Sequence, residues 1–333
     1  MSAAAIVGVG WRTPLGRDVA GAVDRLLAGD VAAAPLTRIP AASYQLRRAA
    51  VVADEPARSK HARFLRRMAL HAIDAAGEAL TAAAAAGVVT GPRVGLYAAV
   101  GGLRAHWDDI MAALARQRDD GADAWARGLG TIHPFWMLRH LSNNAHALLA
   151  ADSGARGDGA TFGGASAGAQ ALAAAIRALA AGAVDAAIVV AYDSLLEPET
   201  LVELGAREGD DVVPGEAAAA LVLVAADDPR GAGRVRVRAA TGADGERGRP
   251  ADRTVAAAVD RVTVGVAAAT PLDVVGAMGE LGAAASPVQA IALAELIGRG
   301  GHGARAAATA TGAPGLVGAI VVELPGDRPG APP

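Results

Sequence analysis

The sequence predicts an α/β fold with parallel strands covered by helices. Short runs rich in Val, Ile and Ala alternate with long Ala-rich windows of helical spacing, which is the pattern of strands joined by covering helices. Of the 333 residues, 53% are hydrophobic but only 3% are aromatic, so Ala, Val and Leu must pack against Gly in the core. This apolar content, with 42 glycines in no fixed period, is typical of a globular chain.

In the first half, the apolar runs and Ala-rich windows alternate in chain order. They predict a strand at 4–9, a helix at 18–27, one or two helices at 58–86, a strand at 94–100, helices at 105–116 and 134–150, a strand at 159–162, a helix at 165–181, and strands at 185–191 and 217–225. A Gly- and Asp-rich loop separates the last two strands, and the Pro and Gly at 227–233 predict a boundary.

The second half repeats the alternation at smaller scale. Its predicted elements lie at 235–240, 253–259, 262–266, 286–297, 306–310 and 318–323. We therefore expect one structural unit used twice, with an N-terminal half at 1–228 and a C-terminal half at 233–325, although no repeated motif proves the duplication. Residues 326–333 are rich in Pro and Gly and are predicted to be a frayed tail.

Composition and charge argue against several classes of function. The net charge of −3, without a basic stripe, argues against nucleic-acid binding. The absence of cysteine excludes disulfides, thiolate metal sites and any thiol nucleophile. The seven histidines lack paired ligand spacing, so neither a metal nor another cofactor is expected. Neither a signal peptide nor a spanning helix fits, so we expect a cytoplasmic protein without membrane contact.

Two glycines near the start invite a dinucleotide-binding interpretation. Gly8 and Gly10 follow a predicted strand and precede a predicted helix. The third glycine of the fingerprint would fall on Thr13, however, so a tight turn between strand and helix is the favoured interpretation.

The segment 157–194 has the architecture of a reactive site. A short strand leads through a turn of small residues into an unbroken Ala-rich helix, and a buried strand follows. Unpaired N–H groups and the helix dipole at such a helix start would stabilise negative charge. The alternative is that the small residues merely allow the helix to cross closely over the strand.

Several motifs together resemble a known family. They are Ala5-Ile-Val-Gly-Val-Gly-Trp-Arg-Thr-Pro-Leu-Gly16, Leu26-Leu-Ala-Gly29, Arg93-Val-Gly-Leu96, His133-Pro-Phe-Trp136, Leu141-Ser-Asn-Asn144, Ala165-Ser-Ala-Gly168 and Val213-Pro-Gly-Glu216. In these motifs the chain resembles the β-ketoacyl synthases of the thiolase superfamily. The resemblance implies a thiolase-like fold, a duplicated arrangement of five layers, α-β-α-β-α.

The same resemblance implies where the catalytic residues of the family would fall. Its nucleophilic Cys matches Ala165, its first active-site His matches Val266 and its second His matches Glu280. In the family, the thiolate accepts an acyl chain, and the imidazoles stabilise an enolate oxyanion after malonyl decarboxylation. A methyl group cannot attack a thioester, so no catalytic residue is expected here.

A scaffold without this chemistry resembles a chain-length factor, the inactive half of a ketosynthase heterodimer. The resemblance implies an active ketosynthase subunit and an acyl carrier protein as partners, in polyketide, polyene or fatty-acid-type chain elongation. It also implies that the strand before the nucleophile turn pairs across the two-fold axis. Phe135, Trp136 and Phe162 would then lie at the partner interface or the acyl tunnel, although ordinary core packing explains these aromatics equally well.

Two alternatives stay open. Gly164-Ala-Ser166-Ala-Gly168 is formally the G-x-S-x-G elbow of a serine hydrolase or acyltransferase, with His302 and either Asp273 or Asp193 as possible triad partners. The other alternative is a homodimeric scaffold without an acyl substrate.

Overall fold

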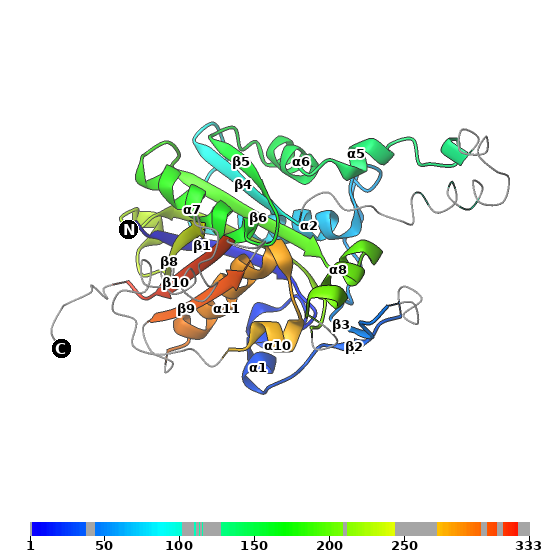
Figure 1. Ribbon diagram of the computed structural model, residues 1–333. Coiled ribbons are helices and arrows are strands. Elements are labelled where there is room, and N and C mark those ends of the chain that lie inside the picture. Colours follow the sequence, from blue (N-terminus) through cyan, green and yellow to red (C-terminus); the bar gives the residue numbers. More distant parts are fainter. Residues whose placement is uncertain are drawn as a thin grey trace.

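A computed structural model describes residues 2–37, 44–101, 110, 113, 115, 128–208, 212–243, 272–300, 305–311 and 316–325. Within these ranges, eight strands form one sheet in the order β5-β4-β6-β7-β1-β8-β10-β9, and helices cover it (Figure 1). The α/β class predicted from the sequence is confirmed.

The elements have the following bounds. The strands are β1 (Ala4–Arg12), β4 (Val94–Val100), β5 (Gly159–Gly163), β6 (Ala186–Ser194), β7 (Glu216–Ala225), β8 (Arg236–Ala243), β9 (Arg305–Thr311) and β10 (Leu316–Glu323), with a separate small pair, β2 (Ala34–Pro35) and β3 (Arg48–Ala49). The helices are α1 (Val19–Leu27), α2 (Arg67–Ala85), α5 (Trp136–His140), α6 (Asn144–Ser153), α7 (Ala167–Ala180), α8 (Pro198–Glu208), α10 (Val274–Met278) and α11 (Ala285–Gly298), with short 3₁₀ turns η3 (Pro229–Gly231) and η4 (Gly282–Ala284).

The sheet is mixed, so the prediction of parallel strands is wrong for most of it. β4 runs parallel to β5 and β6, whereas every pairing from β6 to β9 along the sheet is antiparallel. For the pair β6 and β7, the reason lies in the connection between them. Helix α8 packs in a separate apolar cluster, with Leu201 and Leu204 beside Leu46, rather than crossing the sheet. The chain therefore returns at the same end, and Ser194 faces Glu216.

The described residues form four of the five predicted layers. Helices α2 and α6 cover one face of the arm β5-β4-β6-β7-β1. Helices α7 and α11 lie between this arm and the second arm, β8-β10-β9, because both helices contact strands of each arm. The arms join where Ala4 and Ala5 of β1 pair with Val237 and Arg236. Buried side chains of β6 alternate between the two faces of the sheet. This one strand therefore contributes to the apolar core on each face.

Gly8 and Gly10 lie inside β1, so the predicted turn between strand and helix is wrong, and β1 continues to Arg12. Both glycines face α2. A Cβ on Gly8 would collide with the carbonyl oxygen of Ala79, and one on Gly10 with that of Ala75. Their function is therefore close packing of a helix backbone on a strand, as glycine permits.

Other element boundaries also differ from the prediction. Helix α2 begins at Arg67 rather than at 58, the window 134–150 is two helices, and α8 and α10 were not predicted. The predicted elements at 253–259 and 262–266, most of 105–116 and the tail 326–333 lie outside the described residues. No helix in the described part of the chain is long and apolar enough to cross a membrane.

Candidate functional site

The predicted nucleophile turn connects β5 to α7. Gly164 has a φ of +96°, in the region that favours glycine, and its N–H donates to the carbonyl of Val100 at 3.0 Å. The N–H of Ala167 then donates to the carbonyl of Gly164 at 3.0 Å, which closes the turn. Ala165 is half-buried directly before α7, a helix of 14 residues that has no side-chain cap. Ala165 therefore directly precedes the N-cap of a helix whose first N–H groups have no side-chain cap.

Packing of α7 brings the segment that contains Glu280 close to this turn. Gly168 lies against Pro287 and the carbonyl of Ala283, with no space for a Cβ. Upstream of these contacts, the N–H of Glu280 donates to the carbonyl of Val213 at 2.8 Å, and its carbonyl accepts from Gly215 at 2.9 Å. The contacts of Gly168 thus join α7 to the segment that follows Glu280, and the predicted correspondence of Ala165 and Glu280 to catalytic positions stays a prediction. Val266, the third, lies outside the described residues.

Asp193 joins the end of β6 to this region. The side chain is 4% exposed, and its carboxylate accepts from the N–H of Ser194 at 2.8 Å and from that of Ala283 at 2.9 Å. Gly101 and Gly282 leave the space that the carboxylate fills, because a Cβ on either would collide with it. Asp193 therefore fixes the turn that follows Glu280.

The contacts of Ser166 differ from those of a hydrolase nucleophile. Its backbone has φ −86°, which is unstrained, and its side chain is 3% exposed. Its Oγ accepts from Nε2 of Gln170 at 2.9 Å, and an amide cannot serve as the base. Asp273 caps α10 through the N–H of Gly276, and Asp193 is held as described above. These contacts assemble no triad among the described residues, and His302 lies outside them.

A polar cavity of about 140 Å³ opens nearby, at the carboxyl ends of β4 and β6. Sequence reasoning missed it, because its charged side chains come from distant segments. Its lining includes Arg66, Arg67, Arg139, Asp193, Glu197 and Glu216. Glu216 is fully buried, and its carboxylate accepts from Arg67 at 2.6 Å and from the hydroxyl of Ser194 at 3.1 Å. Burial raises the pKa of Tyr192, another lining residue, so this phenol stays neutral.

No group of three or more His, Asp or Glu side chains in the described ranges could hold a metal ion.

Residues 1–228 match the model of the "Beta-ketoacyl synthase, N-terminal domain" family. The chain belongs to the β-ketoacyl synthase family. No curated protein is significantly similar to it in sequence. The thiolase-like fold predicted from the sequence is confirmed by solved β-ketoacyl synthase structures, which the chain matches over almost its full length.

Three such structures illustrate the similarity of fold. The chain has a TM-score of 0.78 and 18% identity to the ishigamide ketosynthase/chain length factor, covering 97% of this chain and 99% of that one. It has a TM-score of 0.76 and 16% identity to a β-ketoacyl synthase from Burkholderia phymatum STM815, covering 97% and 100%. With the AntDE:AntF structure, a type II PKS acyl-carrier protein in complex with its ketosynthase bound to the hexaketide, it has a TM-score of 0.68 and 14% identity, covering 97% and 99%.

Within this β-ketoacyl synthase fold, the three predicted interface aromatics lie in two places. Phe135 makes an edge contact with Phe64, with ring centroids 5.1 Å apart, and Trp136 lies 4.5 Å from His140. Phe162, on β5, packs instead against the core between the two arms. All three side chains are half-buried.

Proposed function

We propose that the chain is a non-catalytic, chain-length-factor-like subunit that pairs in the cytoplasm with an active β-ketoacyl synthase. Its complex would elongate chains of polyketide, polyene or fatty-acid type carried by an acyl carrier protein. One observation supports this proposal most directly: the chain belongs to a family with a cysteine nucleophile but contains no cysteine.

The residues at the matched positions argue in the same direction. Ala165 stands at the start of α7 and offers a methyl group, which forms no acyl-enzyme. A carboxylate at Glu280 would repel both the malonyl carboxylate and the enolate. Val266 offers neither a hydrogen-bond donor nor a base. We therefore propose that all three catalytic functions are absent.

The edge of the sheet offers a surface for pairing. β5 is the last strand in the order of the sheet. The N–H of Leu96 donates to the carbonyl of Asp158, and that of Gly164 to the carbonyl of Val100, so even-numbered residues of β5 direct their backbone groups toward β4. Odd-numbered residues, including Thr161, direct theirs away from β4. Such an edge can accept a strand from a partner.

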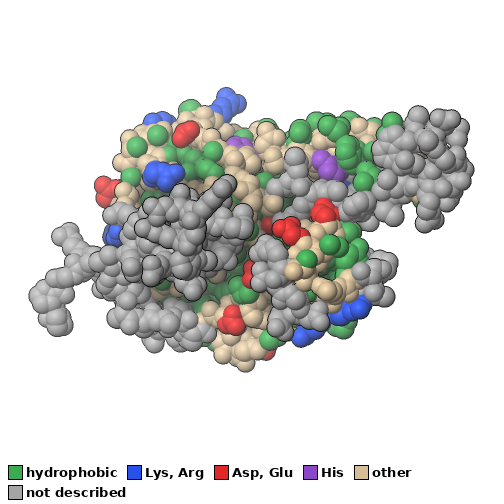
Figure 2. All heavy atoms as spheres, in the orientation of Figure 1, with side chains coloured by type: hydrophobic (Ala, Val, Ile, Leu, Met, Phe, Trp, Pro, Cys, Tyr) green, Lys and Arg blue, Asp and Glu red, His purple; other side chains and the backbone are tan. Residues whose placement is uncertain are grey.

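Helix α5 adds apolar surface to the proposed interface. Met137, Leu138 and Leu141 are 67%, 43% and 47% exposed, although all are large and apolar. α5 projects from the sheet in Figure 1, and Figure 2 shows hydrophobic side chains gathered over this part of the molecule. Exposed apolar patches of this kind mark protein interfaces. Phe135 and Trp136 directly precede these exposed residues in the chain and are half-buried.

The similar structures are consistent with this assignment. One is described as a ketosynthase/chain length factor, and another as a ketosynthase in complex with its acyl-carrier protein. Both show only that the fold suits such assemblies, because the sequence identities are 18% and 14%.

The first experiment compares the protein alone with the protein co-expressed with a cysteine-bearing ketosynthase. Alone, it should neither condense nor decarboxylate malonyl carrier protein, whereas the co-expressed pair should elute as a heterodimer and elongate an acyl chain. Activity of the isolated protein, or failure to co-purify with any such ketosynthase, would contradict the proposal. Labelling of Ser166 by a fluorophosphonate would instead favour a hydrolase, and a stable homodimer would favour a scaffold.

The second experiment tests the sheet edge. Thr161→Pro removes an N–H that points away from β4, so the heterodimer should weaken by tenfold or more while the subunit stays folded. Thr161→Ala is the matched control, because it keeps the N–H and removes only the hydroxyl and methyl groups of the side chain. This hydroxyl lies 2.9 Å from Nδ1 of His146. Native mass spectrometry measures the pairing, and equal pairing of both variants would contradict the use of this edge.

A further inference from the structure

His71 is a buried histidine that lacks a hydrogen-bond partner. It lies on α2, is 0% exposed, and neither ring nitrogen has a partner within the described part of the chain. An unpaired polar group is unfavourable to bury, because it gives up hydrogen bonds to water without replacing them. A neutral imidazole carries this cost at one donor and one acceptor, but an imidazolium would carry it at two donors together with a charge.

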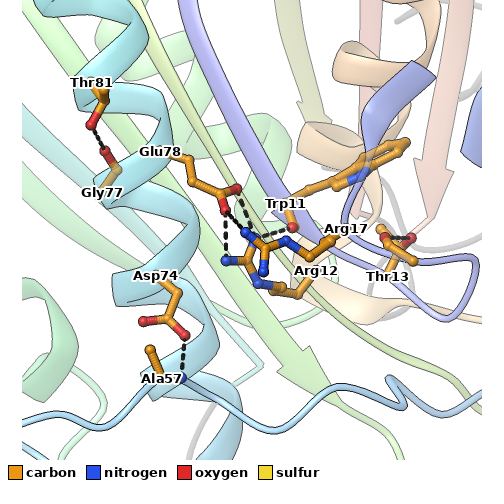
Figure 3. A network of polar contacts seen from close by, with 10 residues as sticks. Trp11, Arg12, Thr13, Arg17, Ala57, Asp74, Gly77, Glu78 and Thr81 are labelled. Carbon is orange, nitrogen blue, oxygen red and sulfur yellow. Dashed lines mark hydrogen bonds and ion pairs between the residues drawn. The ribbon is translucent and has the colours of Figure 1, made fainter. Parts of the chain in front are cut away.

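A short segment of coil is hydrogen-bonded to residues of α2 that flank His71. We call residues 52–57 the strap. Arg67, one turn before His71, donates to the carbonyl of Val52, and to that of Asp54 at 3.3 Å. Asp74, nearly one turn after His71, accepts from the N–H of Ala57 at 2.8 Å, as Figure 3 shows. Residues spaced three or four apart share a helix face, so the strap is tied to α2 on both sides of His71.

The charged groups around His71 are already engaged. On α2 they are Arg67 and Asp74, on β7 Glu216, and on β1 Arg12, while the strap carries Asp54 and Glu55, both exposed. The carboxylate of Glu216 accepts from Arg67, from Ser194 and from the N–H of Val52. Arg12 forms a paired hydrogen bond with Glu78 (Figure 3). An imidazolium here would therefore face two guanidinium groups, and the nearest carboxylates already have donors.

We propose that the strap is an acid-sensitive cover over His71, which opens when this side chain takes up a proton and becomes hydrated. Opening would also free Glu216 from the N–H of Val52 and would admit water to the polar cavity that Arg67 and Glu216 line. The proposal concerns the conformation of this chain and does not depend on its pairing with a ketosynthase.

The direction of the pH dependence follows from the two states. Burial, followed by the charge of Arg67, lowers the pKa of His71 in the closed state, whereas the open state has the ordinary value of about 6.5. The open state therefore binds more protons below about pH 6.5, and acid favours opening. Between pH 7.5 and 5.5 the opening constant should rise by up to about tenfold, and above pH 7.5 it should be constant.

Hydrogen exchange of the whole protein tests the proposal. The amides of Val52 and Ala57 should exchange up to about tenfold faster at pH 5.5 than at pH 7.5, after correction for the intrinsic rate, while amides inside β6 keep their protection. His71→Phe, with a nonionisable ring, should abolish this difference. If that variant fails to fold, His71→Leu replaces it.

The matched control is His146→Phe, because burial also lowers the pKa of the half-buried His146, whereas its Nδ1 lies 2.9 Å from the hydroxyl of Thr161. This variant should keep the acid response of the strap. Asp74→Asn should speed exchange at Ala57 at both pH values, without changing their ratio. A wild-type strap with equal corrected exchange at pH 5.5 and 7.5, or an unchanged response in both His71 variants, would overturn the proposal.

Discussion

At the scale of single residues, glycine determines how closely the layers approach. Gly8 and Gly10 place the backbone of α2 directly on β1, and Gly168 places α7 on the turn before α11. The small side chains of the Ala-rich helices complete these contacts, which explains how a chain with 3% aromatic residues still buries a large core.

Two glycine substitutions should have opposite effects. Gly8→Ala should destabilise the fold by about 1–3 kcal/mol or more, because the new Cβ collides with the backbone of α2, which cannot rotate away. Gly77→Ala, at an exposed position inside α2 with free space for a Cβ, should stabilise it by about 1 kcal/mol. Urea unfolding followed by circular dichroism measures both. Equal effects of the two changes would show that the close contact at Gly8 is relaxed.

At the scale of elements, one ion pair joins α2 to β7. The guanidinium of Arg67 lies 2.6 Å from the carboxylate of Glu216, and the side chains are 23% and 1% exposed. Glu216 also accepts hydrogen bonds from the N–H of Val52 and from the hydroxyl of Ser194. The pair therefore holds the helix, the strap and the end of β6 together.

Replacing one partner of this ion pair should lower the free energy of unfolding more than replacing both partners. Arg67→Met should destabilise by about 3–5 kcal/mol, because it leaves a buried carboxylate without its cation. The double variant Arg67→Met with Glu216→Gln should lose less free energy of unfolding than Arg67→Met alone. Denaturant unfolding of the wild type, both single variants and the double variant gives the coupling energy. Additive losses would mean that solvent already screens the pair.

At the scale of the whole molecule, the two proposed halves share one core. The apolar cluster around α7 and α11 includes Trp11 and Val189 from the first arm and Val237 and Ile320 from the second. We propose that the boundary at 229–232 separates two structural halves that do not fold independently.

A fragment of residues 1–231 should therefore be expanded and should lack a cooperative unfolding transition, because α7 loses α11 and the arm β8-β10-β9 as packing partners. Near-ultraviolet circular dichroism and urea titration of the fragment and of the full chain measure this. A fragment with a native-like transition would contradict the shared core.

The sequence by itself determined the elements whose signals are local. The apolar run at 94–100 is β4, and the helical window at 18–27 contains α1, because both signals depend on neighbouring residues alone. The family could be identified from the sequence for the same reason, because each motif that carries the resemblance is a short continuous segment. The absence of cysteine, which excludes a thiol nucleophile, is likewise a property of composition.

Only the tertiary structure determined the contacts between segments that are distant in the sequence. The antiparallel return from β6 to β7, the packing of Gly8 on α2, and the meeting of the segments around 165, 193 and 283 all join residues far apart in the chain. The hydrogen bonds that tie the strap to α2 on both sides of His71 are of the same kind, because the strap lies outside that helix. Periodicity reports which face of an element is apolar, but it does not report which other element covers that face.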